Sequence, residues 1–221
     1  MPTRRNILSS GLAMMALACT PTPSVKDDHD SATDTEGSAH TGDTGDTAGP
    51  EDTGTPWEGE CSATQPADSG PFYRENAPAR TDLRTLGETG TELRLDLQVR
   101  TAADCTVVEG AVVELWHAQQ DEIYDMTTDE LHYRTKLVSD DRGRLSIVTL
   151  RPPNYGTEDG NLIGAHIHVK IEAEGHLPLF TQLRFVGDAY NGNFPVELQM
   201  DPTTADDGAQ EAEFVFFLMP A

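Results

Sequence analysis

Two histidines, His166 and His168, stand two positions apart within an apolar run at residues 164–171. Side chains alternate between the two faces of a strand, so both imidazoles would share one face while the apolar residues beside them share the other. Imidazole is a common metal ligand, and a strand of this pattern can present two imidazoles to one ion. The pair alone is more typical of a half-exposed strand with a polar face, so the metal interpretation depends on further ligands.

Two tyrosines are candidates for those ligands. Tyr124 comes eight residues after Trp116, past the end of an apolar strand, and Tyr155 follows the turn at residues 152–153. Phenolates and hydroxide are hard anionic donors that suit Fe(III) better than Zn(II) or Cu(I). Two phenolates and one hydroxide would balance three positive charges in a pocket of low polarity. Taken alone, a tyrosine at a turn is usually an amphipathic surface residue, and that is the alternative for each.

The elements that must position these residues are strands. Residues 92–100 alternate strictly, with Leu93, Leu95, Leu97 and Val99 on one face and polar or charged residues on the other. Similar short runs are predicted at residues 111–116, 144–150, 165–173, 180–186 and 213–218, and no segment shows a long helical period. Short strands separated by regular turns predict an all-β fold, an antiparallel β-sandwich.

Residues 1–19 have the form of an export signal. Arg4 and Arg5 precede an apolar run that is too short to span a membrane, which is typical of a twin-arginine signal peptide. Residues 16–18 fit a signal-peptidase site, and the following Cys19 is predicted to be the lipidated cysteine of a lipoprotein. A cleaved, unlipidated chain is the alternative. The sequence thus predicts export, with Cys19 as a lipid anchor in the periplasm or at the cell surface.

Residues 20–60 form a low-complexity linker with eleven acidic residues against one lysine. Such a segment cannot bury enough apolar surface to offset the entropy of ordering, so it is predicted to be a disordered tether. Residues 61–221 are then one domain that is long enough to build a core. The net charge of −23 for the whole chain argues against a nucleic-acid partner.

The predicted domain contains two cysteines, Cys61 and Cys105. In an exported protein an even pair indicates a disulfide rather than a reactive thiol or a thiolate metal site. We therefore predict that Cys61 and Cys105 are joined.

Several motifs, taken in order, resemble the intradiol ring-cleavage dioxygenases, particularly the exported single-domain members of that family. The matching stretches are Ser69-Gly70-Pro71-Phe72-Tyr73, residues 80–84, residues 110–118 with Tyr124 at the spacing of the first iron tyrosine, residues 139–143, residues 149–155 with the second tyrosine, His166-Ile167-His168, and residues 181–185. Each stretch is a weak signal by itself. Their order over residues 61 to about 187 is specific.

The resemblance implies a non-haem mononuclear Fe(III) centre held by Tyr124, Tyr155, His166 and His168, with hydroxide as the fifth ligand. It further implies that a catechol binds there, that Tyr155 takes up one of its protons, and that O2 opens the ring to a muconate-type diacid. Gln182 matches a glutamine of the family's pocket, and an exposed strand amide is its alternative. The implied partners are a small aromatic diol and O2.

One position departs from the family's pattern. The family places an arginine three residues before the first histidine, and here that position is Ile163. A cation near developing negative charge stabilises a transition state, so its loss bears on turnover more than on iron binding. Arg134 and Arg184 are candidate replacements, with surface or packing roles as the alternative.

Two functions from different classes therefore remain at the level of the sequence. One is an exported dioxygenase. The other is an iron-binding or catalytically impaired β-sandwich lipoprotein that acts as a binding module. The helical segment through which catechol dioxygenases dimerise has no counterpart in this sequence, so no oligomeric state is predicted.

Overall fold

The computed structural model describes residues 57–157 and 159–221. The predicted signal peptide at residues 1–19, with Cys19, and residues 20–56 of the predicted linker lie outside this part. Within the described residues no helix is both long and apolar enough to cross a membrane. Regular structure there is almost entirely strand, with one 3-10 turn at Val196–Leu198.

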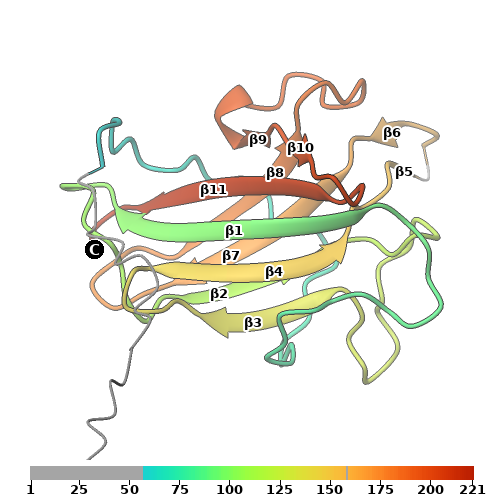
Figure 1. The fold of residues 1–221 in the computed structure, drawn as a ribbon, viewed down its shortest axis with the longest axis horizontal. Helices are drawn as coiled ribbons and strands as arrows, with labels where there is room; N and C mark the ends of the chain where they lie inside the picture. The colour runs from blue at the N-terminus through green and yellow to red at the C-terminus, as the bar shows by residue number, and fades with distance from the viewer. Residues whose placement is uncertain (1–56, 158) are drawn as a thin grey trace, which may run out of the picture. The chain divides into compact units, whose positions relative to one another are not determined.

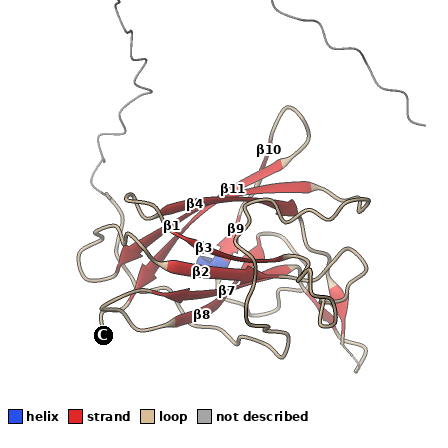
Figure 2. Cartoon of the chain, turned by 90° about the horizontal axis from the view of Figure 1, so that it is seen from below, coloured by secondary structure: helices blue, strands red, loops and turns tan. Residues whose placement is uncertain are grey.

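Two sheets form the layers of a sandwich (Figures 1 and 2). The first sheet has the order β10-β11-β1-β4 and the second the order β3-β2-β7-β8-β9, while β5 and β6 form a separate hairpin. The strands are β1 (Glu92–Thr101), β2 (Val112–Trp116), β3 (Arg134–Val138), β4 (Arg144–Leu150), β5 (Tyr155–Gly156), β6 (Leu162–Ile163), β7 (His166–Glu172), β8 (Leu179–Phe185), β9 (Gln199–Met200), β10 (Thr203–Thr204) and β11 (Gln210–Leu218).

The strand β1 shows how alternation builds the core. Its inward residues Leu93, Leu95, Leu97 and Val99 are at most 2% exposed. They belong to the same apolar cluster as the buried residues of β2 and β7 in the second sheet. Burial of each such side chain contributes about 1.5–3 kcal/mol, so the contact between the two sheets is the main source of stability. The predicted β-sandwich is confirmed.

The pairing of β1 differs from the antiparallel arrangement that was predicted. β1 and β11 run parallel, in register from Leu93 opposite Gln210 to Thr101 opposite Leu218, and β8 and β9 also pair in parallel. Parallel neighbours cannot be joined by a tight turn, so they come from separate parts of the chain. Local alternation therefore predicts both strands but carries no information about which distant strand lies beside β1.

The sequence pattern also does not predict β3. This strand pairs with β2, with Arg134 opposite Trp116. Arg134 and Thr135 are 2% and 0% exposed. Thr135 Oγ1 donates a hydrogen bond to Arg80 O at 2.6 Å, so burial of these polar residues depends on tertiary partners rather than on an apolar period.

The segment at residues 64–74 covers the outer face of the second sheet. The Ala67 N–H donates to Phe180 O at 2.9 Å, Thr181 Oγ1 donates to Gln65 O at 2.9 Å, and Gln182 Nε2 donates to Asp68 O at 2.8 Å. On the outer face of β7, His166 and His168 are buried beneath this segment, whereas Lys170 is partly exposed and Glu172 is exposed. The part of this face that carries the two histidines is therefore interior.

A disulfide joins Cys61 to Cys105, whose Cα atoms are 5.3 Å apart. Just before it, Trp57 packs edge-on against Phe217, with ring centroids 5.4 Å apart, and Arg100 lies over the indole at 5.3 Å. Trp57 falls within the predicted linker, so packing of the described chain begins before Cys61.

We expect mass spectrometry of protein purified without reductant to find the peptides of Cys61 and Cys105 linked, and to find them separate after reduction. Replacing both cysteines with serine should lower the free energy of unfolding by about 4 kcal/mol, because the bond closes a loop with a sequence separation of 44 residues. Denaturation in urea measures this loss. Two free thiols in the unreduced protein would contradict the prediction.

Candidate metal centre

His166 and His168 lie on the outer face of β7 with their Nε2 atoms 3.1 Å apart. His166 Nδ1 is 2.8 Å from Gly164 O. A carbonyl only accepts hydrogen bonds, so Nδ1 carries the hydrogen and Nε2 presents its lone pair to the site. Trp116 stacks on the His168 ring, with centroids 5.0 Å apart and an interplanar angle of 6°, and this contact orients the second imidazole.

Tyr124 reaches the same point from the loop that follows β2. Its Oη is 3.2 Å from His166 Nε2, and the residue is 4% exposed. Phe72, from the covering segment, stacks on the phenol ring at a centroid distance of 4.4 Å and an angle of 15°. The Tyr124 phenol and the His168 imidazole thus both lie within hydrogen-bond distance of His166 Nε2.

Tyr155 joins this group from β5. Its ring centroid is 5.7 Å from that of Tyr124 and 5.5 Å from that of His166. Tyr155 is partly exposed and stands opposite Ile163 in the β5–β6 hairpin. The structure therefore brings together all four residues that the sequence singled out as metal ligands, from three separate stretches of chain.

The electrostatics of the group suit metal binding. Burial lowers the pKa of His166 to about 4 and the pKa of His168 to about 3, so both imidazoles are neutral at pH 7. Burial and the adjacent Tyr155 phenol raise the pKa of Tyr124 far above its usual range, and burial also raises the pKa of Tyr155. A phenolate at either position therefore requires a compensating cation beside it.

The chemistry of the donors distinguishes between metals. Among the described residues, no three His, Cys, Asp or Glu side chains converge so as to hold a metal ion. A centre at this position depends instead on two phenol oxygens in addition to the two imidazoles. That donor set fits a hard trivalent ion such as Fe(III), whereas zinc sites are usually built from cysteine, histidine and carboxylate.

Asp125 holds the loop that carries Tyr124, a role that the sequence analysis missed. Its carboxylate accepts hydrogen bonds from the backbone N–H groups of Thr127 at 3.1 Å, Thr128 at 2.9 Å and His132 at 2.9 Å. Burial opposes ionisation, but the hydrogen bonds outweigh it and hold the pKa of Asp125 well below its usual range. An aspartate two residues before threonine is a common turn signal, and that signal was available in the sequence.

Arg134, one of the two candidate cations, also supports this loop. Its Nη2 donates to Asp125 O at 3.0 Å. Burial lowers the pKa of Arg134 to about 10, which leaves the guanidinium charged at pH 7. Its positive charge lowers the pKa of Tyr124 in opposition to burial.

Gln182 and Arg184 lie on β8 beside the histidines. The register places Gln182 opposite His168 and Arg184 opposite His166. The Gln182 amide donates to Asp68 O in the covering segment, and its oxygen accepts from Arg184 Nη2 at 3.3 Å. The predicted pocket glutamine therefore adjoins the histidine pair and is 8% exposed, so the alternative of an exposed strand amide is not what the structure contains.

A cavity of about 850 Å³ opens beside the two phenols. This volume lies in the range of roughly 300–1,000 Å³ that is usual for small-molecule sites. Its lining residues are Pro71, Phe72, Gln119, Glu122, Ile123, Tyr124, Asp125, Met126, Thr127, Thr128, Tyr155, Gly156, Thr157 and Ile163. The phenols and Ile163 thus share one cavity wall with the loop after β2.

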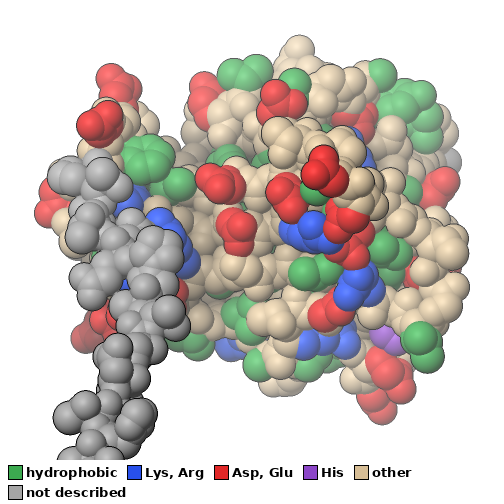
Figure 3. Space-filling model, viewed as in Figure 1, with side chains coloured by type: hydrophobic (Ala, Val, Ile, Leu, Met, Phe, Trp, Pro, Cys, Tyr) green, Lys and Arg blue, Asp and Glu red, His purple; other side chains and the backbone are tan. Residues whose placement is uncertain are grey.

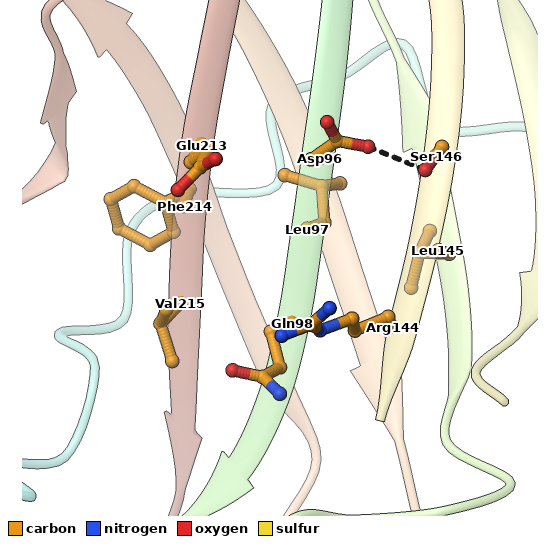
Figure 4. A pocket seen from close by; sticks show the side chains of 9 residues that line it. All are labelled: Asp96, Leu97, Gln98, Arg144, Leu145, Ser146, Glu213, Phe214 and Val215. Atoms are coloured by element: carbon orange, nitrogen blue, oxygen red, sulfur yellow. Dashed lines mark hydrogen bonds between the residues drawn. The ribbon is translucent and has the colours of Figure 1, made fainter. Parts of the chain in front are cut away.

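A second, smaller depression of about 300 Å³ crosses β11, β1 and β4 on the first sheet (Figure 4). The Ser146 hydroxyl donates a hydrogen bond to Asp96 there, and neither histidine nor tyrosine lines it. Acidic side chains spread over the face seen in Figure 3, with basic side chains among them.

Comparison with known proteins identifies the class. A family model described as dioxygenase matches residues 68–199, which include all four candidate ligands. Chlorocatechol 1,2-dioxygenase from Rhodococcus opacus is 32% identical over 155 residues, 60% of each chain. Chlorocatechol 1,2-dioxygenase from Pseudomonas sp. strain P51 is 30% identical over 179 residues, 70% of each chain. The chain belongs to the intradiol ring-cleavage dioxygenase family, as its motifs predicted.

Solved structures share the fold. The crystal structure of 3-chlorocatechol 1,2-dioxygenase from Rhodococcus opacus 1CP aligns with a TM-score of 0.68 at 21% identity, covering 72% of this chain and 73% of that one. The dioxygenase domain of a carbohydrate-binding fusion protein from Streptomyces sp. SirexAA-E aligns with a TM-score of 0.64 at 29% identity, covering 72% of this chain and all of that one. The matched region spans 60% of the length of the Rhodococcus relative found by sequence.

Proposed function

We propose that the protein is an intradiol dioxygenase that cleaves a catechol-type ring with O2 to a muconate-type diacid at a ferric centre held by Tyr124, Tyr155, His166 and His168. The observation that carries this proposal is the convergence of two neutral imidazoles and two phenols beside a cavity. Fe(III) bound there would act as a template and Lewis acid for the diol. Relatives named as chlorocatechol 1,2-dioxygenases support the same reaction class.

Within this proposal the two tyrosines have different tasks. Tyr124 is 4% exposed and stacked on Phe72, so it stays in place. Tyr155 is partly exposed and lies on the short β5–β6 hairpin, so its side chain has more room to move. We assign to the Tyr155 Oη the uptake of one proton from the diol. Gln182, fixed by Asp68, would help to orient the diol beside the histidines.

The proposal extends to location on the strength of the sequence alone. Arg4 and Arg5 with the apolar run after them support export by the twin-arginine route, and Cys19 supports a lipid anchor. Metabolic labelling with a fatty acid would test the anchor, with Cys19→Ser as the control.

The function is tested by colour and by oxygen uptake. Phenolate-to-iron charge transfer should colour the iron-loaded protein burgundy, and catechol added in air should shift the band and then bleach it while O2 is consumed. The second candidate, a binding module, is favoured by Ile163 at the position of the family's arginine. A coloured protein that binds catechol without consuming O2 would support that candidate. A colourless protein after ferric reconstitution would contradict both.

Tyr155→Phe is expected to retain iron but to change the visible band, because one of two phenolate donors is lost while Tyr124 and both imidazoles stay. Iron content by mass spectrometry and the absorption spectrum are the measurements. Tyr190→Phe is the control, because Tyr190 is exposed and does not line the cavity. An unchanged band in Tyr155→Phe would contradict the assignment of this tyrosine.

A further inference from the structure

The described residues that line the cavity of about 850 Å³ include acidic side chains but no basic ones. Two of its described lining residues, Glu122 and Asp125, are acidic, and none of them is Lys or Arg. We propose that this cavity selects catechols whose ring substituents are uncharged and apolar, and rejects catechols that carry a carboxylate. This inference rests on the proposed function and names the substrate class of the same site.

The carboxylate of Asp125 is buried in its loop, with its side chain 2% exposed, and is compensated there by Arg74, whose Nη1 lies 3.7 Å from Asp125 Oδ1. Backbone N–H groups of Thr127, Thr128 and His132 surround its carboxylate as hydrogen-bond donors. Arg74 and Arg134 also donate to carbonyl oxygens of the same loop: Arg74 Nη1 donates to Thr128 O at 2.8 Å and Arg134 Nη2 to Asp125 O at 3.0 Å. Both arginines hold the loop and neither lines the cavity.

Glu122 is the acidic residue whose charge is exposed at the rim of the cavity. It is exposed and lies in a tight turn, where its N–H donates to Gln119 O at 3.0 Å and its φ is +70°. A non-glycine residue with positive φ is uncommon, and here the turn places the backbone of Glu122 beside the cavity. A carboxylate on the ring would meet the like charge of Glu122 and would find no Lys or Arg among the described lining residues.

The rest of the wall favours apolar groups. Ile123 and Met126 are 61% and 40% exposed although both are apolar, and they line the cavity with Ile163 and Phe72. A ring substituent placed between them would remove apolar surface from water. Each methylene buried in this way should tighten binding about fourfold.

The test compares 3,4-dihydroxybenzoate with 3,4-dihydroxybenzamide, which has nearly the same shape without the charge, and with 4-methylcatechol. Dissociation constants are measured by anaerobic titration of the visible band of the iron-loaded full chain, so turnover is not required. We expect the benzoate to bind at least about tenfold more weakly than the benzamide at low ionic strength, and 4-methylcatechol to bind tighter than catechol. Added salt should reduce the difference in affinity between the benzoate and the benzamide, because the rim of the cavity is exposed.

Two charge-reversal variants locate the effect. Glu122→Lys should lower the ratio of the benzoate to the benzamide dissociation constant at least about threefold. Glu130→Lys makes an equal change of charge in the same loop but outside the cavity lining, and it should leave this ratio unchanged. The inference would be overturned if benzoate bound as tightly as benzamide, or if the ratio of their dissociation constants were the same in both variants. Either result would leave the dioxygenase proposal standing. Failure of catechol itself to perturb the band would overturn both.

Discussion

Replacement of His168 by alanine is expected to remove nearly all bound iron and to lower kcat/KM for a catechol by more than about 1,000-fold. The reason is geometric: His168 Nε2 lies 3.1 Å from His166 Nε2, so its loss leaves a single imidazole with two phenols. Neutral imidazole is available at this position because burial keeps the pKa of His168 at about 3. Iron content, the visible band and oxygen uptake are the three measurements.

A matched control distinguishes loss of the ligand from loss of the fold. His176→Ala removes a histidine that follows β7 and contacts Glu174 O, away from the cavity, and should keep iron and activity. His168 also stacks on Trp116, so alanine is expected to lower Tm by a few degrees, and near-ultraviolet circular dichroism shows whether the sandwich persists. A folded His168→Ala protein with normal iron content would exclude His168 as a ligand.

Asp125→Ala is expected to have the second-largest effect, on stability and on iron together. The side chain is 2% exposed and organises the backbone N–H groups of Thr127, Thr128 and His132. Their loss of a partner should lower the free energy of unfolding by about 3 kcal/mol or more. Because Tyr124 precedes this aspartate directly, iron affinity should fall by about 10- to 100-fold, as for other residues that support a metal ligand.

The pH dependence of this loss is a further check. The folded-state pKa of Asp125 is depressed, so its contribution to stability is present above its unfolded pKa of about 3.9 and is lost as the pH falls toward the folded value. The difference in stability between the parent protein and Asp125→Ala should therefore shrink below about pH 4. Asp129→Ala, an exposed residue of the same loop, should cost less than about 0.5 kcal/mol at any pH. Equal losses in the two variants would contradict the assignment.

Periodicity and residue chemistry predicted the features that depend on neighbouring residues in the sequence, such as single strands and the types of the candidate ligands. The alternation at residues 92–100 matches β1, and the predicted run at residues 144–150 matches β4. The four candidate ligands could be named because phenol and imidazole together are a specific donor set, and the structure brings them within contact of one another. Their role in holding iron is still a prediction.

Long-range partners could not be predicted in this way. The pairing of β1 with β11, the covering of β7 by residues 64–74 and the hold of Asp125 on its loop depend on which segments meet in space. The shape of the cavity depends on the same contacts, because Phe72 in the covering segment and Ile163 in β6 line it from distant parts of the chain. A single sequence gives each residue type but not these contacts between distant segments.

The placement of β11 next to β1 has a consequence for biosynthesis. Leu93 in β1 pairs with Gln210 in β11. During translation the edge of the β1–β4 pair therefore stays unpaired until β11 has left the ribosome. Such high contact order favours folding over milliseconds to seconds, and only after β11 has been synthesised. A nascent chain stalled before β11 should therefore engage chaperones, and completion of the final strand should release it.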